Sequence, residues 1–137
     1  LYHVRTSYKP QTALLLPTEE GHWQPNAISK TSAVQAAPGL VVYWFGADLF
    51  YANVNHFVEE VHQIVRSASL RWVVIDAGSI TAMDYSAESD IARLSQEISG
   101  HGAELVWVHV RGELQGQLVK FKTFESLRDC LTAYQRG

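Results

Sequence analysis

The segment best suited to chemistry spans residues 75–87, where a run of apolar residues ends at Asp76 and polar residues follow. Asp84 and Ser86 stand where an amphipathic pattern begins, and the side-chain oxygen of either residue can cap a helix there. Ser86 is also a candidate phosphate acceptor, because a phosphate at a helix N-terminus meets backbone N–H groups and the positive end of the helix dipole. Asp84 would oppose the added charge, so capping and phosphorylation both stay open as interpretations.

A second segment, residues 46–53, places two aromatic residues beside another expected helix start, where Asn53 or Asn55 can act as the cap. In one interpretation Leu49 and Phe50 fold back over the helix as a hydrophobic staple. In the other they form an exposed surface for a partner.

Motifs of known enzyme classes are absent. The chain has no Gly-rich phosphate loop, no G-x-S-x-G elbow and no dinucleotide fingerprint. The histidines do not cluster: His56 and His62 are too far apart along a helix to form a metal-binding pair. Asp76, Asp84 and Ser86 are expected to lack a nearby histidine or lysine that could serve as a base. We therefore expect no enzyme, no metal site and no required cofactor.

Composition limits the remaining classes. The chain has 137 residues, of which 47% are hydrophobic and 18% charged, which predicts one domain with a buried core. A net charge of -3 argues against a nucleic-acid partner. The only cysteine, Cys130, cannot form an internal disulfide and is expected to pack as a small apolar residue. No apolar run is long enough to span a bilayer. The chain starts at Leu1 without a signal-peptide pattern, so we expect a piece of a longer protein.

Strands and helices alternate along the last two thirds of the chain. Buried strands are predicted at residues 40–45, 72–76 and 105–110, and helices at 54–68, 87–98, 113–119 and 124–134, the last capped by Thr123. This alternation predicts an α/β fold whose central strands are parallel. Sites in such sheets lie at the carboxyl ends of the strands, which directs attention to the loops at 46–53 and 77–86.

The first third of the chain is irregular and carries all four prolines. Residues 13–16 form a short apolar run bracketed by prolines, which predicts an edge strand. Residues 26–37 have the composition of a loop or linker. We therefore expect one domain in two parts: residues 1–37 as a tether with the first edge strand, and residues 38–137 as the core.

Four stretches together resemble the STAS domain of SulP-family sulfate and anion transporters. They are PGLVVY (38–43), DLFYAN (48–53), RWVVIDA (71–77) and MDYSA (83–87). The resemblance runs from about Arg5 to the helix that contains Leu127. It implies a STAS-like mixed sheet of four to five strands with parallel central strands and three to four flanking helices.

The resemblance also implies a role. Such a domain is the C-terminal part of an integral membrane protein, on the cytoplasmic side of the plasma membrane or of the bacterial inner membrane. It would be non-catalytic and regulatory, without crossing the membrane itself. Its partners would be the transmembrane domain of the same transporter and a second copy of the domain, with GTP or ATP as a weak ligand.

STAS domains are related to bacterial anti-sigma-factor antagonists, in which a serine of an Asp-Ser-Ser-Gly motif is phosphorylated. Here Asp84-Tyr85-Ser86-Ala87 stands in that place, with Ser86 at the acceptor position and with Tyr85 and Ala87 as departures. The alternative function is thus a free-standing switch phosphorylated on Ser86. The residues expected to face a partner or nucleotide are Asp48, Leu49, Phe50, Asn53, Asp76, Asp84, Tyr85, Ser86 and Ser89.

Overall fold

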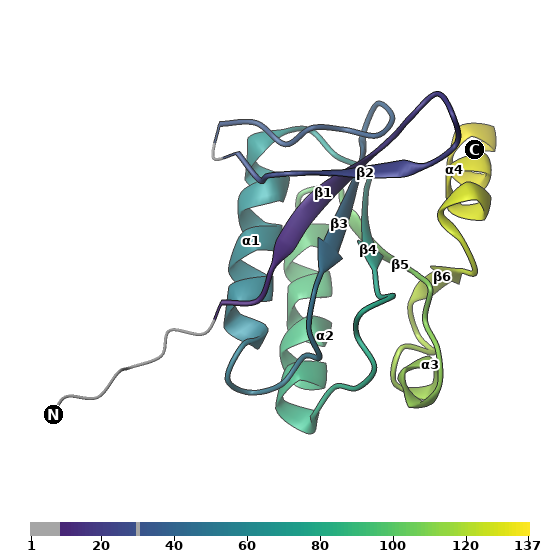
Figure 1. The fold of residues 1–137 in the computed structure, drawn as a ribbon. Coiled ribbons are helices and arrows are strands. Elements are labelled where there is room, and N and C mark those ends of the chain that lie inside the picture. Colours follow the sequence, from purple (N-terminus) through teal and green to yellow (C-terminus); the bar gives the residue numbers. More distant parts are fainter. Residues whose placement is uncertain (1–8, 30) are drawn as a thin grey trace, which may run out of the picture.

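The fold is a single mixed sheet with helices on both faces (Figure 1), seen in a computed structural model that describes residues 9–29 and 31–137. The elements are β1 (Thr12–Pro17), β2 (Trp23–Asn26), β3 (Leu40–Phe45), α1 (Val54–Ser67), β4 (Trp72–Asp76), α2 (Tyr85–Ser99), β5 (Glu104–Val108), α3 (Glu113–Gln117), β6 (Lys122–Phe124) and α4 (Leu127–Arg136). Within these described residues, no helix combines the length and the apolar character that a bilayer crossing requires.

The strand order of the sheet is β2-β1-β3-β4-β5-β6. Strands β3 to β6 are parallel to one another, while β1 is antiparallel to both of its neighbours. The predicted α/β class with parallel central strands is therefore confirmed, and the sheet has six strands where four to five were expected. In Figure 1 the carboxyl ends of the parallel strands lie at the bottom, where α1 and α2 begin.

Both faces of the central strands are buried, which explains why these strands are continuously apolar. One face packs against α1 and α2, and Phe57 of α1 is fully buried there against the rings of Tyr43, Phe45 and Trp107. On the other face Leu40 and the alternate residues after it pack with α4, the helix seen on the right in Figure 1. That second face is covered less completely, because only one of the longer helices lies on it.

The first third of the chain contributes more to the sheet than expected. The apolar run at residues 13–16 is part of β1, but β1 is not an edge strand, because β2 pairs along its outer side. The chain reverses between the two strands through Gly21, whose φ of 87° favours glycine. Pro25 is tolerated in β2 because the outer side of an edge strand needs no N–H donor.

Three predicted boundaries near the C-terminus are wrong. Thr123 does not cap a helix: it pairs with Trp107 within β6, and Ser126 caps α4 by accepting a hydrogen bond from the Asp129 N–H. Strand β5 ends at Val108, because His109 adopts a left-handed φ of 61°. The short helix α3 ends at Gln117, two residues before the predicted end.

Candidate functional site

The two predicted loops lie together at the carboxyl end of the sheet. Leu49 and Met83 form an isolated bridge in which the Leu49 N–H donates to the Ala82 carbonyl and the Asp84 N–H donates to the Leu49 carbonyl. The loops that follow β3 and β4 are thus joined by backbone hydrogen bonds. Two carboxylates add to this connection: Asp48 of the first loop accepts hydrogen bonds from the second, and Asp84 of the second accepts one from the first.

Asp48 holds the middle of the loop that follows β4. Its Oδ1 accepts hydrogen bonds from the Thr81 N–H at 2.6 Å, the Thr81 hydroxyl at 2.8 Å and the Ala82 N–H at 3.3 Å. Partial burial is the largest single influence and raises the pKa of Asp48, but the hydrogen bonds from Thr81 and Ala82 together outweigh it. The net result is a pKa below the ordinary value, so the loop contact favours the charged carboxylate.

Asp84 is the cap of α2, and it also reaches the other loop. Its Oδ1 accepts from the Ala87 N–H at 2.8 Å and its Oδ2 accepts from the Tyr51 N–H at 2.9 Å. Of the two capping candidates, Asp84 is therefore correct. Ser86 is not a cap: it lies inside the first turn of α2 and is half-buried.

Asn53 occupies the cap position of α1 without capping it. Its side-chain oxygen accepts from the Phe50 N–H at 3.0 Å, and its amide donates to the Asp48 carbonyl at 2.8 Å. Asn53 therefore closes its own loop. It is only 2% exposed and Leu49 is fully buried, so neither side chain is presented at the surface.

Three aromatic side chains of the joined loops and the start of α2 are exposed to solvent. Phe50 is 39% exposed, Tyr51 is 77% exposed and Tyr85 is 83% exposed. Because the Tyr51 N–H bonds to Asp84, Tyr51 lies next to the start of α2, where Tyr85 begins the helix. We call Phe50, Tyr51 and Tyr85 the aromatic surface. Ser89 is also exposed, on the same helix.

Asp76 does not join this group. It is the last residue of β4 and lies on the α4 side of the sheet, where its Oδ1 is 2.9 Å from Nδ1 of His109 and also accepts from the Gly78 N–H. The expectation that Asp76 has no histidine near it is wrong, because His109 is adjacent across parallel strands while distant in sequence. The signal was present: Asp76 and His109 are both polar residues at the carboxyl ends of predicted strands.

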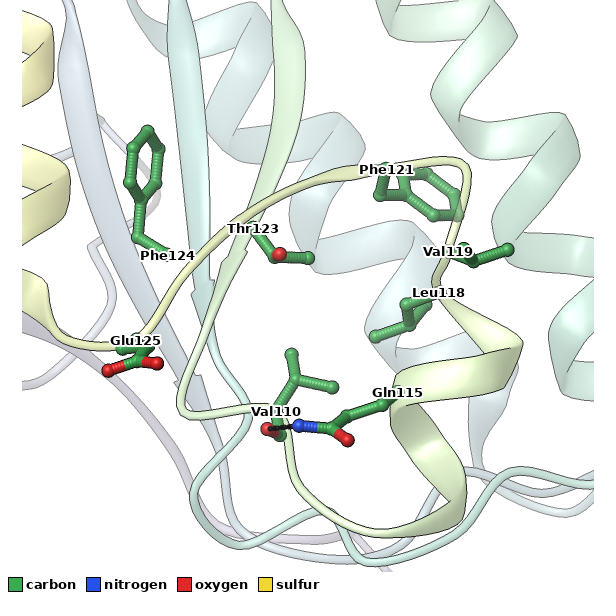
Figure 2. Close-up of a pocket in the computed structure, with 8 residues that line it drawn as sticks. All are labelled: Val110, Gln115, Leu118, Val119, Phe121, Thr123, Phe124 and Glu125. Atoms are coloured by element: carbon green, nitrogen blue, oxygen red, sulfur yellow. Dashed lines mark hydrogen bonds between the residues drawn. The ribbon is translucent and has the colours of Figure 1, made fainter.

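A separate hollow of about 350 Å³ lies between α3 and β6. In Figure 2 the Gln115 side chain points toward Val110, whose carbonyl accepts its amide hydrogen bond, and the Phe124 ring points away toward α4. Glu125 is the only ionisable residue that lines the hollow. The hollow therefore offers no acid–base pair, and no residue in it was predicted as a site residue.

Metal ligands are also scattered. Across residues 9–29 and 31–137, no group of three or more His, Cys, Asp or Glu side chains is placed to hold a metal ion. At the joined loops the carboxylates of Asp48 and Asp84 are occupied by N–H and hydroxyl donors from the chain itself. The hydrogen bonds of Asp48 and Asp84 therefore fix the conformation of the two loops that carry the aromatic surface.

Comparisons with solved structures find the same fold in transporters. Murine Slc26a9, an anion transporter solved in the inward-facing state, has a TM-score of 0.77 at 14% identity, with 93% of this chain and 22% of that chain covered. A second SLC26A9 structure has a TM-score of 0.74 at 13% identity, with 94% and 24% covered. This chain thus spans less than a quarter of either transporter.

The fold is also similar to tm1081 of Thermotoga maritima, which carries the description of an anti-sigma factor antagonist. That likeness has a TM-score of 0.61 at 12% identity and covers 71% of this chain and 88% of that chain. No curated protein matches the sequence. The family model of the STAS domain matches residues 31–134, most of the chain. The protein therefore belongs to the STAS domain family, as the sequence resemblance predicted.

Proposed function

We propose that this STAS domain is a non-catalytic regulatory part of a SulP-type anion transporter. It would lie on the cytoplasmic side of the membrane and act by contact with the transmembrane domain of the same chain. The observation that carries the proposal is the aromatic surface, which is exposed while the loops beneath it are tied together. The likeness to murine Slc26a9, an anion transporter, supports the choice of partner.

The aromatic surface has the properties of a contact site. Tyrosine and phenylalanine side chains bury a large area at little cost in conformational entropy, and they are enriched in protein interfaces. Tyr51 and Tyr85 are mostly exposed; the Tyr51 backbone is held by Asp84, and Tyr85 is the first residue of the helix that Asp84 caps. A partner would therefore meet a surface whose shape is already set.

The test begins with the gene. We expect the coding sequence upstream of Leu1 to contain a series of membrane-spanning helices, and their absence would contradict the transporter assignment. In that full chain, the double substitution Tyr51→Ala and Tyr85→Ala is expected to change the rate of anion uptake into vesicles. Val119→Ala is the control, because Val119 is 76% exposed outside the aromatic surface. Equal uptake by the double variant and the control would refute the role of this surface.

A second copy of the domain is the other proposed occupant of the aromatic surface. Sedimentation of the isolated domain tests it: a dimer that dissociates in the Tyr51→Ala and Tyr85→Ala variant supports the contact. A dimer that persists unchanged in this variant would place the contact elsewhere on the domain.

We also propose GTP or ATP as a weak ligand of the joined loops. The support is the first turn of α2, which presents backbone N–H groups besides the one that Asp84 accepts from. Titration with either nucleotide should then shift amide resonances at residues 48–53 and 76–89. Shifts confined to the opposite end of the sheet would contradict this location, and no shift at millimolar nucleotide would contradict binding.

A free-standing switch phosphorylated on Ser86 is the second candidate function. It is favoured by the likeness to tm1081, of which 88% is covered. It is also favoured by the position of Ser86 in the first turn of α2, where its hydroxyl is not needed as the cap. Phosphate found on Ser86 by mass spectrometry of the protein from its own cells would support this function over the transporter domain. Its absence under all growth conditions would exclude the switch.

A further inference from the structure

The incompletely covered face of the sheet carries a groove that the proposed function does not use. It has a volume of about 360 Å³ and lies where β1, β2 and β3 approach the start of α4. Its apolar walls are formed by Leu15, Pro25 and Leu127 and by the rings of Trp23 and Trp44. Such a volume and lining suit a small organic molecule.

The polar end of the groove is the Asp76–His109 pair. A carboxylate only accepts hydrogen bonds, so Nδ1 of His109 donates to Oδ1 of Asp76, and neutral His109 then carries a lone pair on Nε2. The Gly78 N–H also bonds to Oδ1, and Oδ2 has no partner among the described residues. With neutral imidazole, the pair presents two acceptors and one negative charge. The Asp76 side chain is 13% exposed and that of His109 is 38% exposed.

The walls and the pair are held before any ligand arrives. The indole N–H of Trp44 donates to the Ser79 hydroxyl at 3.2 Å, which fixes the ring against the loop after β4. His109 is the only non-glycine residue with a positive φ in the described part of the chain. Strained backbone of this kind is concentrated at functional sites, where the surrounding structure keeps it in place.

We propose that this groove binds a small aromatic amine. The aromatic body would lie against Trp23, Trp44 and Leu15, and the ammonium group would donate to the carboxylate of Asp76 and to Nε2 of His109. Trp rings also attract a nearby cation. The charge decides between ligand classes, because an aromatic carboxylate would place a second negative charge beside Asp76. Arg111, the cationic residue nearest in sequence to His109, donates to the Gly78 carbonyl and does not line the groove.

Tryptamine is the probe, and two indoles of similar size are its controls. Indole-3-propionate replaces the ammonium with a carboxylate, and 3-ethylindole has no charge. At pH 8, titration with tryptamine should shift the amide and indole resonances of Trp23 and Trp44 and the amide resonance of Gly78. Either control should bind with an affinity at least about tenfold lower. This comparison uses the unaltered protein. No shift with tryptamine, or equal binding of either control, would overturn the proposal.

Asp76→Asn then tests the pair itself. Asparagine keeps a side-chain oxygen for His109 and Gly78 but removes the charge, so tryptamine affinity should fall about tenfold while 3-ethylindole is unaffected. Asp90→Asn is the matched control, since Asp90 lies on α2 and pairs with Arg93. Unchanged tryptamine affinity in Asp76→Asn, or an equal loss in Asp90→Asn, would overturn the proposal. The result does not depend on the aromatic surface, so either proposal can fail alone.

Discussion

Removal of the Asp84 carboxylate is expected to weaken both the start of α2 and its connection to the loop after β3. In Asp84→Ala the Ala87 N–H loses its capping partner and the Tyr51 N–H loses its bond from the other loop. Loss of an N-cap costs about 1 kcal/mol of stability, and loss of a hydrogen bond to a charged acceptor costs about 1 kcal/mol more at an exposed site. The free energy of unfolding should therefore fall by about 2 kcal/mol.

Urea unfolding measures this change directly. With a slope of about 2 kcal/mol per molar urea, the midpoint should fall by about 1 M, and the melting temperature should fall by about 6–8 °C. Amide exchange should accelerate at Tyr51 and Ala87 in particular, because their N–H groups are the ones released.

Two neighbouring variants act as controls. Asp84→Asn keeps an oxygen that can cap, so it should cost less than about 1 kcal/mol. Ser86→Ala should cost less than about 0.5 kcal/mol, because Ser86 is inside the first turn and alanine favours the helix. A cost for Ser86→Ala equal to that of Asp84→Ala would show that the assignment of the cap is wrong. A cost below about 0.5 kcal/mol for Asp84→Ala would show that the two loops are joined by other means.

Three further predictions follow from burial and charge. Phe57→Ala should lower the free energy of unfolding by about 3–5 kcal/mol in a urea melt, because its ring is fully buried among Tyr43, Phe45 and Trp107; a loss below about 1 kcal/mol would contradict this packing. Burial raises the pKa of the Cys130 thiol to about 11, so a thiol reagent at pH 8 should label it slowly in the native protein and rapidly in urea; fast native labelling would contradict its burial. The pKa of Asp48 is lowered in the folded state, so its contribution to stability is present above its unfolded pKa and is lost as the pH falls through the folded value. The free energy of unfolding of Asp48→Asn should therefore differ from that of the unaltered protein at neutral pH and approach it in acid. A difference that grows in acid would refute the sign.

Local patterns in the sequence determined the main elements of this fold. The apolar run at residues 40–45 indicated a strand buried on both faces, and β3 spans those residues. The spacing of Phe57 and Ile64 among polar residues indicated the buried face of α1. These predictions hold because burial imposes a period on each element that does not depend on its neighbours. The location of two loops at one end of the sheet followed from the same patterns. The STAS assignment did not: it came from the resemblance of four stretches to a known family, which the family model confirms.

Tertiary structure alone decided which residues meet. Asp84 rather than Ser86 is the cap because α2 begins at Tyr85. The amphipathic pattern in the sequence locates a helix start only to within a few residues. The Asn53 side chain accepts a hydrogen bond from the Phe50 N–H instead of capping α1. Residue spacing does not show which of two local donors such a side chain will bind. Asp76 and His109 are paired because β4 and β5 lie parallel in one particular register, which matches Asp76 with Val108 immediately before His109. Register depends on the packing of both strands at once, so the polar strand ends indicated that Asp76 and His109 share one edge of the sheet but not that they pair.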